Sequence, residues 1–172
     1  RISNMGADGD AAIDALNPVA AYNPVSKEYL VAWQADDTTA PLVNDEFEIY
    51  AQRLNADGAN VGSRIRVSNA GTDGSAAIDA TVPALAYNPA GNEYLVVWQA
   101  DSDAAPLVDN EFEIYAQRLS ADGAEIGADT RISDMGSDGD AVYDALDPTV
   151  VHNATDNQYL VAWEGTDDSG GL

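Results

Sequence analysis

Short runs in which apolar and polar residues alternate dominate the hydrophobic pattern of this chain. The clearest is EYLVAWQ at residues 28–34, where Tyr, Val and Trp alternate with Leu and Ala, and it recurs as EYLVVWQ from Glu93 and QYLVAWE from Gln158. A period of two, carried by β-branched and aromatic residues, is typical of a β-strand. Because no stretch shows a sustained period of 3.6 residues, the pattern favours an all-β protein.

Three further runs accompany the first of these, so that four strands are predicted before the pattern starts again. They lie at residues 18–22, 46–54 and 61–68 and are separated by turn-rich loops. The last two are joined by Asp57-Gly58, a pair that supplies the positive φ of a tight hairpin. Four antiparallel strands joined by short turns, with a longer loop to the next copy, describe one blade of a β-propeller.

The strand pattern belongs to a sequence repeat with a constant period. Copies beginning RISNMGADGDAAIDALNP, RVSNAGTDGSAAIDATVP and RISDMGSDGDAVYDALDP start at Arg1, Arg66 and Arg131, so the spacing is 66 − 1 = 65 and 131 − 66 = 65. A fixed period of this length is typical of a chain that stacks one supersecondary unit. The fold we predict is a β-propeller-like repeat of four-stranded antiparallel blades, about two and a half units long.

The repeat also predicts the domain organisation. We expect a first repeat at residues 1–65, a second at 66–130 and a truncated third at 131–172. Propellers usually close with about 4 to 8 blades, so this number of blades cannot close a ring alone. We therefore expect a fragment of a longer array, or a protomer completed by a neighbour.

The chain carries the combination NPxxNEYLVVWQ, then NEFEIYAQRL, then ADG and a closing RVSN. This combination resembles the β-propeller repeat modules of large bacterial secreted and surface proteins. The resemblance covers essentially the whole chain. It implies a propeller fold and an extracellular or cell-surface location, and it implies no catalytic residues.

Charge narrows the choice of partners. The chain has 30 Asp and Glu against 7 Lys and Arg, a formal net charge of −23 at pH 7. Such a field repels phosphate backbones and anionic lipids, so we expect neither nucleic acid nor a membrane surface as partner. The absence of cysteine excludes disulfides and thiolate metal sites. An acidic module that needs a divalent ion fits a calcium-rich extracellular space.

The loop before each first strand is rich in carboxylates. It reads GADGDAAIDA, GTDGSAAIDA and GSDGDAVYDA in the three copies. Calcium takes six to eight oxygen ligands, which closely spaced carboxylates and backbone carbonyls of a glycine-kinked loop can supply. The predicted calcium ligands are Asp8, Asp10, Asp14, Asp73, Asp79, Asp138, Asp140 and Asp144. The alternative is that these residues are turn formers and caps whose side chains accept backbone N–H bonds.

A second acidic cluster lies between the second and third predicted strands. We interpret it as a solvated rim, with a further cation site as the alternative. Its members in the first two copies are Asp36, Asp37, Asn44, Asp45, Glu46, Glu48, Asp101, Asp103, Asp109, Asn110, Glu111 and Glu113.

Catalytic signals are weak in this sequence. The single histidine, His152, takes the place of Tyr22 and Tyr87, which indicates an aromatic substitution, and no Gly-x-Ser-x-Gly motif occurs. We therefore expect a non-enzymatic structural or adhesive module, stabilised by calcium and self-associating through strands or blades, or packed on neighbouring repeats of a longer chain.

Two alternatives involve a glycan as partner. A lectin-like propeller would use exposed Tyr and Trp side chains as stacking platforms, although Trp33, Trp98 and Trp163 fit better as packing between blades. A glycan-active propeller hydrolase would use paired carboxylates.

Overall fold

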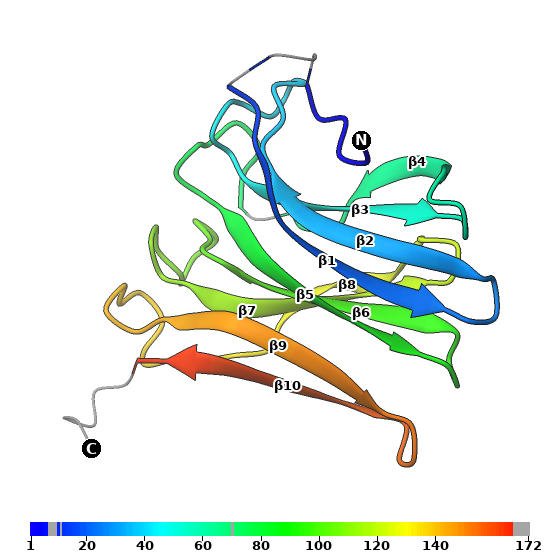
Figure 1. Ribbon diagram of the computed structural model, residues 1–172. Helices are drawn as coiled ribbons and strands as arrows, with labels where there is room; N and C mark the ends of the chain where they lie inside the picture. Colours follow the sequence, from blue (N-terminus) through cyan, green and yellow to red (C-terminus); the bar gives the residue numbers. More distant parts are fainter. Residues whose placement is uncertain (7–9, 11, 70, 167–172) are drawn as a thin grey trace.

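The computed structural model describes residues 1–6, 10, 12–69 and 71–166, which form ten antiparallel strands in three separate sheets (Figure 1). Two sheets have four strands each, in the sequential order β1-β2-β3-β4 and β5-β6-β7-β8, and the third pairs β9 with β10. The prediction of an all-β protein with four-stranded antiparallel units is confirmed. Within the described residues the three sheets do not form a closed propeller.

The strands recur at the same place in each repeat. Their bounds are β1 Ala15–Asn23, β2 Glu28–Ala35, β3 Glu48–Leu54, β4 Asn60–Arg66, β5 Ala80–Asn88, β6 Glu93–Ala100, β7 Glu113–Ser120, β8 Glu125–Arg131, β9 Ala145–Asn153 and β10 Gln158–Gly165. Each full sheet thus ends at the arginine that opens the next sequence repeat, and a connector (residues 67–79 or 132–144) leads to the next sheet. The division into repeat domains itself stays a prediction.

The predicted Asp-Gly hairpin joins β3 to β4. Gly58 has a φ of +79°, which favours glycine. The Asn55 side chain accepts the backbone N–H groups of Asp57 at 3.0 Å and Ala59 at 2.9 Å. The turn residues therefore fix the register of this hairpin, as the sequence predicts.

The two sides of each sheet differ, and we name them by their residues on the second strand. The Tyr face carries Tyr29, Val31 and Trp33 in the first sheet, and the Leu face carries Leu30 and Ala32. The main core lies where the Leu face of the first sheet packs on the Tyr face of the second. A second core repeats this arrangement between the second and third sheets. Alternation along one strand thus supplies both halves of every junction between sheets.

The innermost strands of the three sheets, β1, β5 and β9, lie side by side (Figure 1). Each has a bulge at which one residue takes a positive φ: Asn17 (+50°), Val82 (+51°) and Asp147 (+51°). At the two internal junctions, the backbone N–H of the bulged residue donates to a glutamine of the preceding sheet. Val82 donates to Gln34 Oε1, and Asp147 donates to Gln99 Oε1, both at 2.9 Å.

Val82 is the only β-branched residue of the three bulges, and its replacement by asparagine is expected to stabilise the protein. A left-handed backbone costs an ordinary L-residue roughly 1–2 kcal/mol, which asparagine largely avoids. We expect Val82→Asn to raise the free energy of unfolding by about 1 kcal/mol in urea titrations. The reverse change in the first sheet, Asn17→Val, should lower it by a similar amount. A loss of stability in Val82→Asn would contradict this account.

Candidate functional site

The recurring polar contacts of the molecule gather where each connector meets the sheet before it. The connector begins with a bond from Val67 N to Ile49 O of β3, and just after it the N–H of Ala80, the first residue of β5, donates to Phe47 O before β3, both at 2.7 Å. In the next repeat, Ile132 N donates to Ile114 O at 2.7 Å and Ala145 N donates to Phe112 O at 2.8 Å. Each connector is therefore tied to the sheet that precedes it as well as to the one it begins.

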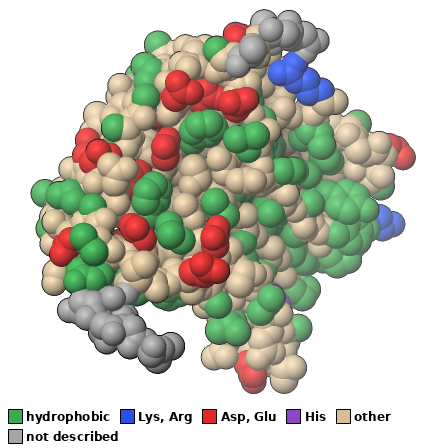
Figure 2. All heavy atoms as spheres, turned by 60° about the vertical axis from the view of Figure 1, so that its left-hand side comes forward, with side chains coloured by type: hydrophobic (Ala, Val, Ile, Leu, Met, Phe, Trp, Pro, Cys, Tyr) green, Lys and Arg blue, Asp and Glu red, His purple; other side chains and the backbone are tan. Residues whose placement is uncertain are grey.

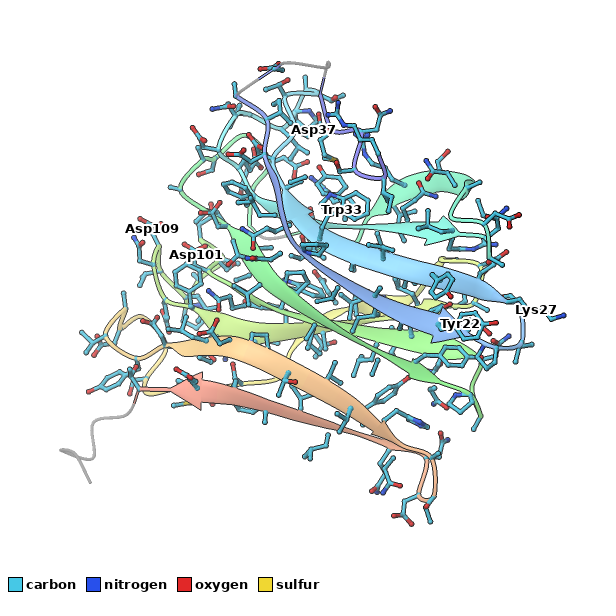
Figure 3. The ribbon with its side chains drawn as sticks, in the orientation of Figure 1. Tyr22, Lys27, Trp33, Asp37, Asp101 and Asp109 are labelled. Carbon is cyan, nitrogen blue, oxygen red and sulfur yellow. The ribbon has the colours of Figure 1, made fainter. Side chains whose placement is uncertain are left out.

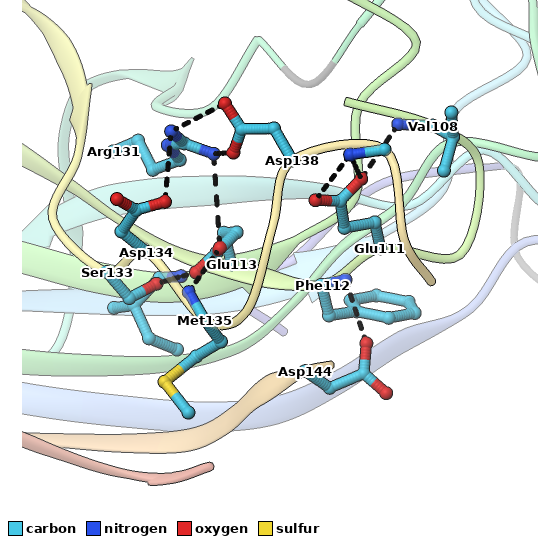
Figure 4. Close-up of polar contacts among 12 residues, drawn as sticks. Val108, Glu111, Phe112, Glu113, Arg131, Ser133, Asp134, Met135, Asp138 and Asp144 are labelled. Carbon is cyan, nitrogen blue, oxygen red and sulfur yellow. Dashed lines mark hydrogen bonds and ion pairs between the residues drawn. The ribbon is translucent and has the colours of Figure 1, made fainter. Parts of the chain in front are cut away.

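A buried glutamate holds the middle of each connector. Glu111 is fully buried and accepts the N–H of Gly139 at 2.9 Å and of Val108 at 3.1 Å (Figure 4). Glu46 makes the same bonds to Gly74 and Val43, both at 3.0 Å. Gly74 has a φ of +96°, a conformation that turns the chain toward the carboxylate. A carboxylate that accepts two backbone N–H groups offsets much of the cost of its burial.

An arginine lies beside a second buried glutamate in each cluster. Arg131 contacts Asp138 at 2.6 Å, Asp134 at 3.6 Å and Glu113 at 3.9 Å (Figure 4). In the first repeat, Arg66 contacts Asp73 at 2.7 Å and Glu48 at 3.7 Å. The guanidinium group thus neutralises part of the negative charge that gathers at the connector.

Two groups of acidic residues at these places could hold a metal ion. They are Glu46, Glu48 and Asp73 in the first repeat, and Glu111, Glu113 and Asp138 in the second, and within each group the ligand atoms lie within 4.8 Å of one another. Two predicted ligands, Asp73 and Asp138, are members. Because Arg66 and Arg131 already contact these groups, a metal ion would have to compete with a guanidinium.

The other predicted calcium ligands make backbone contacts. Asp79 and Asp144 reach back to the preceding sheet, where they accept the N–H of Phe47 and Phe112 at 3.0 Å. Asp10 and Asp140 accept N–H groups two residues ahead, at Ala12 (3.0 Å) and Val142 (3.2 Å). These are the cap and turn roles of the alternative interpretation. Asp14 donates its own N–H to Asp36 Oδ1 at 2.6 Å, and Asp8 lies outside the described residues.

The second acidic cluster is only in part a solvated rim. Asp45 and Asp109 are exposed, as expected, but Asp36, Asp101 and their neighbours on β3 and β7 are buried. Asp101 accepts the N–H of Asp79 at 2.7 Å and of Asn110 at 3.0 Å. The solvated-rim interpretation was wrong for these buried residues, because it considered only their charge and not the loop N–H groups that they could accept. The recurrence of the same acidic residues in both repeats could have indicated a structural role.

Burial changes the titration of two linked carboxyl groups. Desolvation raises the pKa of Asp79 and of Asp101 above the usual range, against the lowering effect of the N–H groups that each accepts. The folded protein therefore binds protons at these groups more readily than the unfolded chain does.

The contribution of Asp79 and Asp101 to stability is therefore expected to rise as the pH falls from neutrality toward their raised pKa values. The gain accumulates between those raised values and the unfolded value of about 3.9, because only there does the folded state hold more protons. Melting temperatures measured in steps between pH 7 and pH 4 check this. Asp101→Asn should flatten the pH dependence, because it removes one of the two groups whose pKa is raised.

The position of Arg64 differs in charge between the first two repeats. Arg64 on β4 pairs with Asp37 at 2.7 Å and lies over the Tyr50 ring, 5.6 Å from its centroid. The equivalent of Arg64 in the second sheet is Asp129, whose pKa is raised by burial. Asp129 lines a cavity of about 30 Å³ together with Trp98, Asp101 and Tyr115. The two repeats are thus not interchangeable at this place.

Acidic side chains are spread among hydrophobic ones over the face in Figure 2, which views the molecule from the side of Asp101 and Asp109 in Figure 3.

No helix in the described part of the chain is long and apolar enough to cross a membrane.

No protein-family model matches this sequence, and no curated protein matches it. The fold is similar to a solved structure described as Hadza microbial sialidase Hz136, with a TM-score of 0.60 and 11% sequence identity. The match covers 95% of this chain but 37% of that one. At this identity the likeness shows the fold alone.

This comparison corrects the prediction that the protein is not an enzyme. The neighbour is an enzyme and shares the arrangement of strands, so the architecture gives no ground for excluding catalysis. The prediction failed because it rested on missing motifs for nucleophilic catalysis. His152 does behave as an aromatic substitution, since its ring packs on Tyr159 at 5.1 Å as Tyr87 packs on Tyr94.

Proposed function

We propose that this chain supplies consecutive blades to an extracellular β-propeller-like assembly with a structural or adhesive role, and that it self-associates through its open sheet faces. One observation carries the proposal. No other sheet in the described part of the chain covers the Tyr face of the first sheet or the Leu face of the third, whereas the same faces are buried at both internal junctions. The N-terminal segment covers the Trp33 end of the first face and leaves its Tyr29 end open.

Exposure at equivalent positions supports this proposal. Tyr29 on the first sheet is 41% exposed, whereas its equivalent Tyr94 is fully buried at the first junction. Leu160 on the third sheet is 66% exposed, whereas its equivalent Leu95 is buried at the second junction. Complete burial of an exposed leucine contributes about 1.5–3 kcal/mol, so covering the exposed part of Leu160 would contribute about 1–2 kcal/mol and favours a partner sheet.

The extracellular location and the calcium requirement belong to the same proposal. An acidic, cysteine-free chain is compatible with the outside of a cell, where sites with dissociation constants on the order of 10⁻⁴ to 10⁻³ M stay loaded. The two acidic groups with Arg66 and Arg131 are the places where calcium would act.

Native mass measurement over a range of protein concentrations tests the self-association. We expect species larger than the 18.0 kDa chain, and their loss in Tyr29→Glu. Ala128→Glu is the matched control, because it puts the same charge on an exposed residue of β8 in the second sheet, which carries neither open face. A wild-type chain that stays monomeric at every concentration would remove the proposal.

A glycan-binding or glycan-active role is the second candidate, favoured by the sialidase neighbour. A polar hollow of about 440 Å³ lined by Gln52, Asn60 and Arg64 has the size and the donors for a sugar unit. Binding on a sugar array that is lost in Arg64→Gln would support this candidate. The lectin hypothesis in its aromatic form is not supported at Trp33 or Trp98, which are both buried.

A further inference from the structure

We infer that the partner on these faces is a second copy of this chain, docked head to tail, with the Tyr face of its first sheet on the Leu face of the other copy's third sheet. This inference rests on the proposed self-association and adds its geometry. It predicts a heterologous junction, in which two different surfaces meet, and it names the residues on each side.

The molecule already makes this junction twice. At the first, Leu30 and Ala32 of the first sheet pack against Tyr94 and Val96 of the second. At the second, Leu95 and Val97 of the second sheet pack against Tyr159 and Val161 of the third. Every sheet therefore presents its Leu face to the Tyr face of the sheet that follows it.

A third junction of the same kind needs one surface from each end of the described chain. The Tyr face of the first sheet offers Tyr22 and Tyr29. Its Trp33 end is covered by the N-terminal segment through Ile2, Met5 and Ile13, and an apolar hollow of about 370 Å³ lies between that segment and the sheet. The Leu face of the third sheet offers Val151 and Leu160. These are the equivalents of pairs that are buried together inside the molecule.

The backbone is set for the same polar link. At the internal junctions, the bulged residue donates its N–H to Gln34 or Gln99 of the preceding sheet. In the third sheet the equivalent of these glutamines is Glu164, which is exposed. Asn17 of the first sheet has the same positive φ as the bulged residues that donate. Head-to-tail docking would bring the Asn17 N–H to the Glu164 carboxylate of the other copy.

Charges are complementary at the rim of the proposed junction. Internally, Asn23 Nδ2 donates to Asn92 Oδ1 at 3.0 Å across the first junction. In the proposed junction, the equivalent of Asn23 in the third sheet is Asn153 of one copy, and the equivalent of Asn92 in the first sheet is Lys27 of the other. Lys27 is the only lysine of the chain, is exposed and lies at the same end of the first sheet as Tyr22 (Figure 3). The Asn153 side chain contacts Asp156 at 2.9 Å, so the lysine would approach a carboxylate.

The number of sheets favours a closed pair of copies. Each copy contributes three sheets, so two copies contribute 2 × 3 = 6 and three contribute 3 × 3 = 9. Propellers close with about 4 to 8 blades, and a pair of copies supplies 6 sheets, two of which are the two-stranded sheet of β9 and β10. The expected species is a dimer of 2 × 18.0 = 36.0 kDa that contains two identical junctions.

Mixing two single-face variants tests the head-to-tail geometry. Tyr29→Glu damages one surface and Leu160→Glu the other, so each variant alone should remain monomeric in native mass spectra, because both junctions of its dimer contain a damaged face. Their equimolar mixture should form a 1:1 dimer through the one intact junction. Far-ultraviolet circular dichroism of each monomer checks that it is folded.

Disulfide trapping gives an independent readout, because the chain has no cysteine. Lys27→Cys mixed with Asn153→Cys should give a cross-linked heterodimer on mild oxidation, in at least tenfold excess over either homodimer. The control is the internal pair Asn23→Cys and Asn92→Cys in one chain, which shows that this geometry accepts a disulfide.

The possible results distinguish self-association itself from its head-to-tail geometry. A monomeric wild-type chain overturns both the proposed self-association and its geometry. Association that survives in Leu160→Glu, or a predominance of Lys27→Cys homodimers, overturns the head-to-tail junction alone, since it indicates that two Tyr faces meet. Recovery of the dimer only in the mixed variants supports the inference.

Discussion

Replacement of Trp98 by alanine is expected to lower the free energy of unfolding by about 3–5 kcal/mol, the cost of deleting a large aromatic side chain from a packed core. Trp98 is 1% exposed and lies in the junction between the first and second sheets. It also stacks on Tyr115 at 6.3 Å between ring centroids. Trp98 fills the space between two separate sheets. Because each sheet is held by its own hydrogen bonds, the sheets cannot move together to fill the cavity that the alanine leaves.

The equivalent tryptophan of the third sheet provides the control. Trp163 is 37% exposed, and Trp163→Ala should cost less than half as much as Trp98→Ala. Urea titrations followed by circular dichroism measure both values under the same conditions. Equal losses in the two variants would mean that the junction between the first two sheets is not the main source of stability.

Removal of Arg131 is expected to have the second largest effect, a loss of about 2–3 kcal/mol in Arg131→Ala. A buried pair that loses one partner is destabilised by about 3–5 kcal/mol, and we expect less because the Arg131 side chain is 28% exposed. The loss arises from Glu113, which is fully buried and would remain beside Glu111 and Asp138 without the positive charge of Arg131. Asp134→Ala, which removes a 75% exposed partner of the same arginine, should change stability by less than about 1 kcal/mol.

The same variant tests the calcium prediction. Without the guanidinium, the group formed by Glu111, Glu113 and Asp138 has room and charge for a divalent ion. Millimolar calcium should raise the melting temperature of Arg131→Ala more than that of the wild type, and EDTA should reverse the increase. An equal response of both proteins would place any calcium away from this cluster.

The strands could be predicted from the sequence because alternation at residues 28–34 records which side chains face a neighbouring sheet. The turn at Asp57-Gly58 could be predicted because few residues accept its backbone geometry. Val82 shows the limit: a β-branched residue gives no hint of a positive φ, and only the bond to Gln34 of the preceding sheet explains it. The local sequence pattern predicts that a strand is present, whereas the position of its bulge depends on hydrogen bonds to the neighbouring sheet.

The site was harder to predict, because what a carboxylate does depends on which donors the fold brings to it. Asp73 and Asp79 stand in one loop, yet the first pairs with Arg66 and the second accepts the N–H of Phe47. Arg66 opens the repeat and was available as a signal. Its pairing with a residue seven positions ahead follows from the path of the connector, which the sequence does not display.

The connector that ties itself to the sheet before it has a consequence for how such chains lengthen. A duplicated segment one repeat long contains a new sheet and also the connector that binds this sheet to the one before it. The bonds of Asp79 and Ala80 to Phe47 are of this kind. When stability is a sum of units and nearest-neighbour contacts, each added segment arrives with its own attachment. Arrays of this kind can therefore grow or shrink by recombination between copies without any redesign of the joints.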